Sequence, residues 1–332
     1  MAKVDCPKCG KPGYLTRVKV YGNYYMRVEH YEGGKRRVCY MGKYVSELKR
    51  MLEEVIGGGG GAKILQMPGG DYHIADLLLP RLERLCVKPK CTLVEVFGGS
   101  GYVSQTANRE VFGNIIYNDI NDMLTTFYRY VKEHPEQLAY ILSLLPYSRS
   151  YHRIIRDLVK DPDVASLAAA VIVFYAYNTS FYGKVADRGF SYAVAPNSNE
   201  AKAFRSRIAA ILKYAAAWRD VLIENLDFRA VIKKYDSAKT VFYLDPPYVD
   251  RSEEYYGTPF TVNDLREMAL MLTQIRGRFL LKLDYRTYEL VKDILPEGRY
   301  RVEVFERPLH MQRVRGGKKG KWLLTLVSNP PS

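Results

Sequence analysis

The most informative stretch of this chain is an apolar run that ends in an acidic, proline-rich turn: Val241-Phe242-Tyr243-Leu244-Asp245-Pro246-Pro247-Tyr248. A short apolar run bounded by a turn is typical of a buried strand. A second run upstream ends in a glycine-rich turn: Leu93-Val94-Glu95-Val96-Phe97-Gly98-Gly99-Ser100-Gly101. A strand that enters glycines before a helix start lets the backbone approach a nucleotide-like ligand closely. The two stretches together predict an α/β domain with a ligand site where its strands end.

Further short apolar runs alternate with helical stretches on both sides of these motifs. The runs are Ile115–Tyr117, Phe279–Leu283, Arg301–Phe305 and Leu323–Val327. One helix is expected to begin at Thr261, because Asp264 follows three residues later in a near capping box. Strand–helix alternation predicts a mainly parallel sheet covered by helices. We expect residues 62–121 and 222–332 to form this domain and residues 122–221 to be a mainly helical insertion.

Composition and charge narrow the class of protein. Of 332 residues, 47% are apolar and 26% charged, the balance of a globular protein, and 50 Lys+Arg against 36 Asp+Glu leave a net charge of +14. A protein this basic usually binds a polyanion, most often nucleic acid. The alternative is that a basic isoelectric point is typical of all proteins of its source organism. The longest apolar stretch, 167–177, is too short to span a membrane, and the N-terminus lacks a signal peptide. We therefore expect a cytoplasmic protein without a membrane partner.

Residues 1–56 form a further zone, rich in tyrosine and lysine, with a helical pattern at 43–56; five glycines at 57–61 are expected to be a linker. Its ligand-type residues are Cys6 and Cys9, which form a C-x-x-C pair, and then His30 and Cys39. Such a set suits tetrahedral Zn²⁺, and a small module without a large core would gain from a metal. The zone is predicted to be a zinc-ribbon-like module. The alternatives are a redox C-x-x-C pair and an incomplete ligand set in which His30 takes no part.

The remaining cysteines carry a separate expectation. Five cysteines are an odd number, which does not suggest a secreted disulfide framework. Cys86 and Cys91 flank Pro89 near a strand start and are expected to be buried, small apolar residues. Cytosine-C5 methylation needs a nucleophilic cysteine, usually in a Pro-Cys turn, and no such dipeptide occurs in the sequence.

The two turns, taken together, are similar to the motifs of a known class of enzymes. D-P-P-Y after a strand, with F-x-G-x-G upstream, resembles the amino-methyltransferases that use S-adenosylmethionine (AdoMet). The companion motifs, in their order along the chain, are similar to those of the Dam-type DNA adenine methyltransferase family. They are Lys63 with the Pro68-Gly69-Gly70 turn, Asn118-Asp119-Ile120-Asn121, the loop segments 178–183 and 188–191, and Asn225-Leu226-Asp227-Phe228. The resemblance covers roughly residues 62–332.

Fold, activity and site residues follow from this resemblance as expectations. The fold would be a Rossmann-like AdoMet methyltransferase sheet with an inserted target-recognition domain, acting on N6 of a flipped adenine in double-stranded DNA. The residues expected to bind AdoMet are Lys63, Glu95, Phe97, Gly99, Gly101, Asp119, Asp227 and Phe228. The catalytic turn is Asp245, Pro246, Pro247 and Tyr248. Its carboxylate and the first proline carbonyl would each accept an amine N–H, while the tyrosine stacks on the extruded base.

Three rival functions remain open at the level of sequence. Cytosine-N4 methylation is the nearest, because D-P-P-Y serves either amine. An RNA amine methyltransferase is the second, because zinc ribbons and basic surfaces also serve RNA. The third is a nucleic-acid-binding protein that keeps the fold without activity, against which the intact motifs argue.

Overall fold

The computed structural model describes residues 2–6, 9, 11–20, 23–43, 63–67, 70–158, 166–180, 189–191, 199–247, 249, 260–313 and 319–329. The chain divides into two compact units. The first comprises residues 1–65, 126–181 and 190–216, and the second comprises residues 66–125, 182–189 and 217–332.

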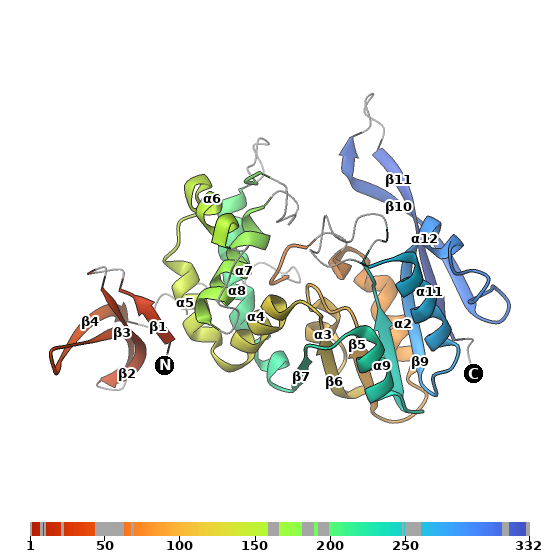
Figure 1. The fold of residues 1–332 in the computed structure, drawn as a ribbon, viewed down its shortest axis with the longest axis horizontal. Helices are drawn as coiled ribbons and strands as arrows, with labels where there is room; N and C mark the ends of the chain where they lie inside the picture. Colours follow the sequence, from red (N-terminus) through yellow and green to blue (C-terminus); the bar gives the residue numbers. More distant parts are fainter. Residues whose placement is uncertain are drawn as a thin grey trace. The chain divides into compact units, whose positions relative to one another are not determined.

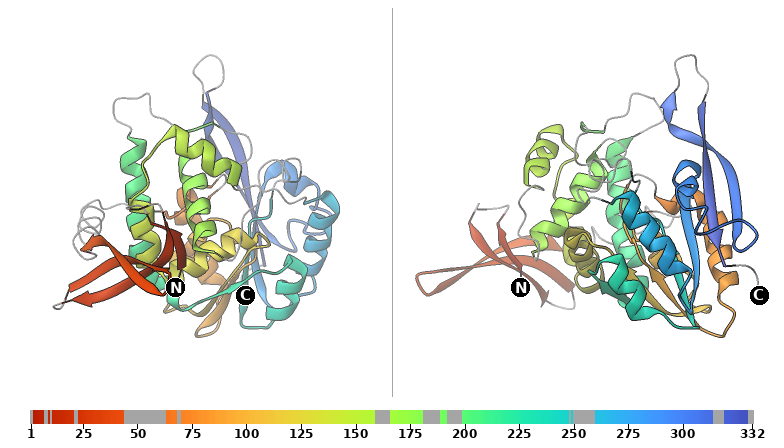
Figure 2. Two further views of the ribbon diagram at one scale, coloured as in Figure 1. Left: turned by 60° about the vertical axis from the view of Figure 1, so that its left-hand side comes forward. Right: turned by 45° about the vertical axis from the view of Figure 1, so that its right-hand side comes forward.

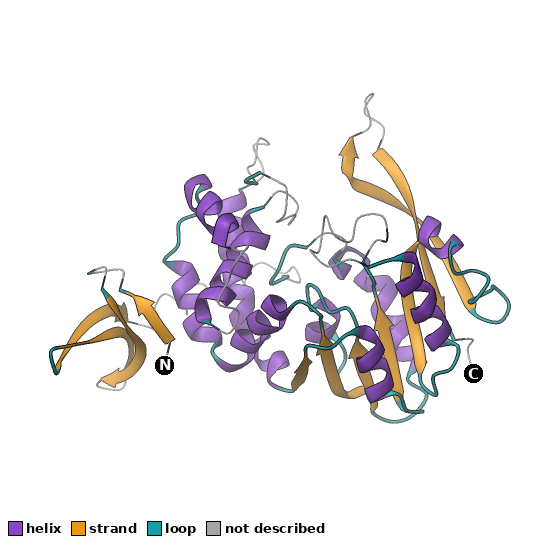
Figure 3. Cartoon of the chain, in the orientation of Figure 1, coloured by secondary structure: helices purple, strands orange, loops and turns teal. Residues whose placement is uncertain are grey.

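The second unit is built on a seven-stranded sheet (Figures 1 and 3). Its strands are β5 (Cys91–Glu95), β6 (Phe112–Asn118), β7 (Val221–Glu224), β8 (Thr240–Leu244), β9 (Arg278–Asp284), β10 (Arg301–Arg313) and β11 (Lys319–Ser328), in the order β10-β11-β9-β8-β5-β6-β7. The five strands from β7 to β9 are parallel, and β11 is antiparallel to both of its neighbours. The predicted mainly parallel sheet is thus confirmed, and with it the Rossmann-like class.

Helices cover both faces of this sheet. They are the short η1 (Asp71–Ile74), α2 (Ala75–Leu85), α3 (Tyr102–Thr106), α9 (Phe228–Tyr235), α11 (Val262–Leu272) and α12 (Tyr285–Glu289). Apolar side chains of α9 and α11 pack on Phe242 and Phe279 in a buried core, while α2 lies against the other face (Figure 1). Thr261 and Asp264 form the predicted capping box at the start of α11.

The first unit contains helices and a separate small sheet. Its helices are α5 (Pro135–Ser143), α6 (Arg149–Leu158), α7 (Leu167–Thr179) and most of α4 (Asp122–Glu133) and α8 (Glu200–Arg219). Helix α7 is apolar nearly all round and is buried over most of its length, as expected of a helix enclosed by others. Across the part of the chain that the structure describes, no helix combines the length and apolarity needed to cross a membrane.

The N-terminal sheet has four antiparallel strands in chain order (red in Figure 2). They are β1 (Ala2–Asp5), β2 (Pro12–Val20), β3 (Asn23–Glu32) and β4 (Lys35–Lys43). Two β-like runs in the sequence, Tyr14–Val20 and Tyr24–His30, predict strands here, and they fall within β2 and β3. The expected helix at 43–56 and the glycine linker at 57–61 lie almost entirely outside the described residues.

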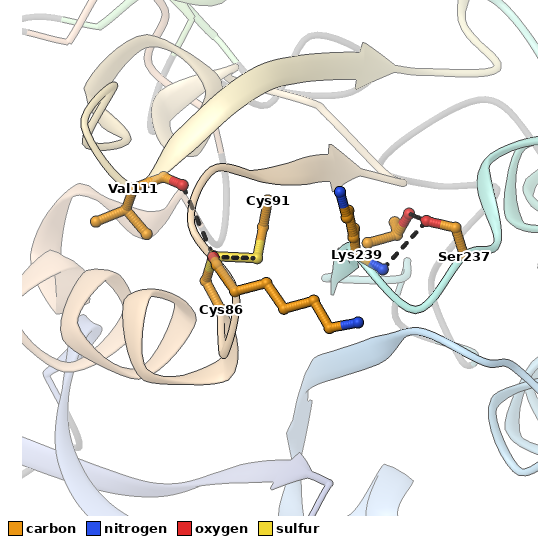
Figure 4. Close-up of a disulfide and its surroundings, with 7 residues drawn as sticks. Cys86, Cys91, Val111, Ser237 and Lys239 are labelled. Carbon is orange, nitrogen blue, oxygen red and sulfur yellow. Dashed lines mark hydrogen bonds between the residues drawn. A yellow bond between two sulfur atoms is a disulfide. The ribbon is translucent and has the colours of Figure 1, made fainter.

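Cys86 and Cys91 were expected to be simply buried apolar residues, but the structure joins them in a disulfide, in which Cys91 is buried and Cys86 is partly exposed (Figure 4). The chain reverses between the end of α2 and the start of β5, and Lys90 takes a left-handed φ of 57° in this turn. The reversal brings the two Cα atoms to 5.7 Å, within the range that a disulfide spans. Spacing along the sequence does not show such a reversal.

Candidate active site

The candidate site lies at the carboxyl ends of the parallel strands. From β5 the chain goes outward to β6 and β7, and then returns to β8 on the other side of β5. Adjacent loops therefore leave β5 and β8 in opposite directions, which opens a crevice of the kind that binds ligands in α/β sheets. The glycine turn follows β5, and the Asp245 turn follows β8.

The glycine turn lies flat against the neighbouring strand. A Cβ on Gly98 would fall 2.2 Å from a ring carbon of Tyr117, so only glycine allows this approach. Gly99 and Gly101 have φ values of +48° and +61°, a left-handed conformation that side chains disfavour. The turn then leads directly into α3 at Tyr102. The loop offers a ligand bare backbone, as the sequence pattern predicts.

Asp119, which follows β6, is held beside this turn. Its two carboxylate oxygens accept backbone N–H groups from Gly99 and Asn121, each at 2.8 Å. Burial raises the pKa of Asp119, and these two hydrogen bonds oppose the rise. Each carboxylate oxygen has a second lone pair, so acceptor positions remain for a ligand with hydroxyl groups.

Glu95, at the end of β5, is buried and accepts hydrogen bonds from the first turn of α3. Its Oε2 atom accepts hydrogen bonds from the backbone N–H and the hydroxyl group of Ser104. Burial raises the pKa of Glu95 to about 8, against the lowering effect of these bonds. The carboxyl group is therefore mostly protonated at neutral pH. A protonated Glu95 can support the glycine loop without placing a charge in the core.

Aromatic rings and a capping acid complete the predicted cofactor set. Phe97 is half-buried, and its ring lies 5.8 Å from that of Phe228, which is buried in the core. Asp227 caps α9 by accepting the backbone N–H of Arg229, whose guanidinium lies 4.2 Å from the ring centre of Phe228. Phe228 therefore has a packing role in the structure, while Phe97 and the half-exposed Asp227 keep surface for a ligand.

Asn118 ties the loops of three strands together, a role that the sequence motif did not reveal. It is buried, and its side-chain amide donates to the carbonyls of Val96 (2.9 Å) and Leu226 (3.0 Å). Its Oδ1 atom accepts the backbone N–H of Leu226 at 2.9 Å. From the other side, Asn225 donates to the carbonyl of Asp119 at 2.8 Å. These bonds fix the loops that carry Phe97, Asp119 and Asp227.

A buried lysine joins two acids at the catalytic turn. Lys282 Nζ lies 2.6 Å from Asp245 Oδ2 and 2.6 Å from Asp71 Oδ1. Lys282 exposes 3% of its side chain, whereas Asp245 exposes 29%. The lysine thus holds one oxygen of Asp245 from inside the protein, while the carboxylate still reaches the surface of the crevice.

Asp245 lines a small cavity that is open to solvent. The cavity is lined by Asp245, Pro246, Pro247, Lys282, Leu283, Asp284 and Thr287. Pro246 is buried and fixes the turn after β8. The expected stacking residue, Tyr248, lies outside the described residues.

Opposing effects set the protonation of Asp245. The pKa of Asp245 is raised to about 7. Burial is the largest cause, the nearby Asp71 adds to the rise, and the charge of Lys282 opposes it. Asp245 therefore changes charge near neutral pH. A carboxylate that ionises in this range can both accept a hydrogen bond and take up a proton during a reaction.

Sequence reasoning missed Lys282 and Asp71, although one signal was present. Lys282 is the lone charge in the apolar run Phe279–Leu283, and a buried lysine needs an ionic partner. Its partner Asp71 is 211 residues away in the chain, so the sequence alone does not identify it.

Two residues of the resemblance belong to the first unit. Lys63 is half-buried, and burial together with the charge of Arg207 lowers its pKa to about 8. Asn178, at the end of α7, is buried and donates to the carbonyl of Ile64 at 3.0 Å. The hydrogen bond gives Asn178 a structural role within this unit.

The predicted metal ligands lie together in the N-terminal sheet. The ligand atoms of Cys6, Cys9, His30 and Cys39 are all within 4.8 Å of one another.

Comparison with known proteins identifies a methyltransferase family that matches this chain. The sequence profile of the D12 class N6 adenine-specific DNA methyltransferase family matches residues 76–270, more than half of the chain. None of the curated protein sequences matches it. Among solved structures, precorrin-6y C5,15-methyltransferase from Geobacter metallireducens is 11% identical with a TM-score of 0.31, covering 76% of this chain and 84% of that one. A protein described as a SAM-dependent methyltransferase from Streptococcus mutans is 9% identical with a TM-score of 0.31, covering 94% of this chain and 55% of that one.

Proposed function

This chain belongs to the D12 class N6 adenine-specific DNA methyltransferase family, and from that premise we propose which of its residues carry out the transfer. The chain is an AdoMet-dependent enzyme that methylates the N6 amine of adenine in DNA. We assign the transfer to the Asp245 turn after β8 and the cofactor to the glycine turn after β5. We expect duplex DNA to be the form that is bound.

The chemistry of the amine explains what Asp245 must do. The N6 lone pair of adenine is delocalised into the ring, so the amine is a poor nucleophile. If Asp245 and the Pro246 carbonyl each accept one N–H, the lone pair is aimed at the incoming methyl group. Because Lys282 holds Oδ2, the other oxygen of Asp245 is the one that meets the amine. One side of the carboxylate is fixed by the protein, and the other is available to substrate.

The cofactor residues are assigned by the same geometry. AdoMet, when bound, supplies a methyl group on a cationic sulfur. The glycine turn brings bare backbone to the crevice, and Asp119 keeps acceptor positions for the ribose hydroxyls. Phe97 and Asp227 are assigned to the adenine of the cofactor. Glu95 is assigned to the support of this loop through Ser104.

A proton must leave the amine as the new N–C bond forms and the S–C bond breaks. Asp245 is in contact with this amine in the proposed arrangement, and its pKa of about 7 allows it to accept the proton. The resulting carboxylic acid of Asp245 would then release the proton to water and regenerate the carboxylate. No further base is required.

The observation that carries the assignment is that a buried lysine fixes Asp245 while the carboxylate stays partly exposed beside a small open cavity. Asp245→Asn removes the charge and one acceptor while keeping the shape, and turnover should fall about 1,000-fold or more. AdoMet affinity should change less than about threefold, because the glycine turn is untouched. Asp293→Asn is the matched control, since Asp293 is exposed and forms its ion pair with Arg266, away from the Asp245 turn. Near-normal turnover by Asp245→Asn would refute the assignment.

A further inference from the structure

Three cysteines and a histidine converge on one point of the N-terminal sheet. Cys6 directly follows β1, and Cys9 lies in the turn toward β2. His30 comes from β3 and Cys39 from β4. Cys9 Sγ lies 3.5 Å from His30 Nε2 and 3.8 Å from Cys39 Sγ. The cluster therefore links the first turn of the module to the neighbouring strands β3 and β4.

These separations match the edges of a tetrahedral zinc site. With Zn–S near ~2.3 Å and Zn–N near ~2.05 Å, tetrahedral angles place two sulfurs ~3.8 Å apart and a sulfur and a nitrogen ~3.6 Å apart. The observed separations of 3.8 Å and 3.5 Å lie within ~0.1 Å of these values. Two of the six separations between the ligand atoms therefore already match tetrahedral edges, and all six are within 4.8 Å.

The ring of His30 is already oriented for a metal. Its Nδ1 atom lies 2.9 Å from the carbonyl oxygen of Pro12. A carbonyl only accepts, so Nδ1 carries the hydrogen, and the neutral ring presents the lone pair of Nε2 toward Cys9. Metal-bound histidines are commonly held in this way by a carbonyl on the other nitrogen.

Gly13 makes this hydrogen bond possible. A Cβ on Gly13 would lie 2.8 Å from His30 Nδ1 and 2.6 Å from a methyl group of Val28. Both distances are shorter than real contacts allow, so any side chain would push β2 away from the histidine. The absence of a side chain at Gly13 therefore lets the backbone of β2 approach the His30 ring closely.

Few of the described side chains of this module are buried. Among the side chains that the structure describes in residues 2–43, the buried apolar ones are Cys6 and Val28, and the buried polar ones are Glu29 and His30. A module of about 40 residues buries too small a fraction of its surface for hydrophobic burial alone to stabilise it well. Small modules of this kind commonly gain their stability from a bound metal.

We propose that Cys6, Cys9, His30 and Cys39 bind one Zn²⁺ that holds the N-terminal sheet together. The set is complete with four protein ligands, which is the form of a structural site. The proposal is independent of the methyl-transfer assignment, because it concerns a separate part of the chain.

Zinc content of the full-length chain tests the proposal. The protein is purified with a non-thiol reductant and without chelator, and metals are measured by mass spectrometry. We expect about one zinc per chain. The double variant Cys9→Ser/Cys39→Ser should retain less than a tenth of this amount. The matched control is Cys86→Ser/Cys91→Ser, which removes the other two cysteines and should keep one zinc.

The histidine and its support are tested separately. His30→Cys supplies another zinc ligand and should retain the metal, whereas His30→Ala should weaken zinc binding at least tenfold. Gly13→Ala keeps all four ligands but should also weaken binding about tenfold, since it displaces the ring. AdoMet binding shows in each case that the methyltransferase unit is folded.

Cobalt reports the geometry. Co²⁺ added to the metal-free parent should give the intense visible bands and thiolate charge-transfer absorption of a tetrahedral site, and the Cys9/Cys39 variant should not. The proposal is overturned if that variant keeps its zinc, or if the reduced parent holds neither zinc nor tetrahedral cobalt.

Discussion

Lys282 lies between two carboxylates, and its charge acts on the residue that we assign to the target amine. A lysine that exposes only 3% of its side chain is stable because Asp71 and Asp245 each accept from it. The side chain of Lys282 is buried, so its ammonium group contacts the Asp245 carboxylate from the interior of the protein. Lys282 is therefore a positioning residue with an electrostatic effect.

The pH dependence of methyl transfer tests this role. Asp245 accepts the amine N–H as a carboxylate, so kcat/KM should rise with pH through the pKa of about 7. Lys282→Met removes the charge that lowers this pKa and should move the rising limb to higher pH. Asp71→Asn removes a charge that raises it and should move the limb to lower pH. The measurement is the kcat/KM profile of each variant, with AdoMet affinity as the control.

Opposite displacements are the critical result, because a purely structural defect would not produce them. If both variants lose activity while the limb stays at the parent's pH, Lys282 acts only through packing.

At the scale of elements, Asn118 holds the ends of β5, β6 and β7 in register. Asn118→Ala would leave the carbonyls of Val96 and Leu226 and one N–H without their partner. We expect the free energy of unfolding to fall by about 3 kcal/mol, since each unpaired buried group costs about 1–3 kcal/mol. AdoMet affinity should fall at least tenfold, because the loops that carry its proposed ligands lose their connection. Denaturant unfolding and calorimetric titration measure the two effects.

The control is Asn114→Ala, since Asn114 lies exposed on the same strand. It should leave both quantities within about 0.5 kcal/mol of the parent. Equal effects of the two substitutions would contradict the role given to Asn118.

The elements that the sequence predicted share one property, which is that local pattern determines them. Val241–Leu244 is entirely buried in β8, and the Thr261 capping box begins α11, as expected. The predicted zinc ligands also lie together, because two short hairpins bring them there. These features depend on neighbours within about 40 residues or on strands of strong apolar character.

What the sequence did not reveal depends on contacts between distant segments or on a local change in chain direction. Lys282 finds Asp71 only once η1 packs against β9, and nothing in either segment specifies that pairing. The Cys86–Cys91 disulfide depends on the left-handed turn at Lys90, a residue type that rarely adopts this conformation. The hydrogen bonds from the Asn118 side chain to Val96 and Leu226 likewise become visible only when the three loops are placed together.

At the scale of the whole molecule, charge is concentrated at one end of the chain. Residues 1–43 carry ten basic and three acidic side chains, so their net charge of +7 is half of the total of +14. Lys35 and Arg37 are exposed on β4. We expect these charges to contact DNA phosphates. Each such contact releases counterions from the DNA, which makes the free energy of binding more favourable.

Removing two of these charges should change the salt dependence of binding. In Lys35→Gln/Arg37→Gln, the slope of log K against log salt should be smaller in magnitude by about 2, since each phosphate contact contributes about 0.9. Lys88→Gln/Lys239→Gln is the matched control, because these residues precede β5 and β8 at the edge of the sheet opposite the site. An unchanged slope in the β4 variant would exclude the module from the DNA interface.

The central claim is methyl transfer to adenine N6 through the Asp245 turn, and product analysis tests it most directly. The enzyme is incubated with AdoMet and mixed-sequence duplex DNA, the DNA is digested to nucleosides, and the products are identified by mass spectrometry. We predict N6-methyldeoxyadenosine with the parent enzyme and its loss with Asp245→Asn. N4-methyldeoxycytidine, or methylation of RNA in place of DNA, would contradict the account.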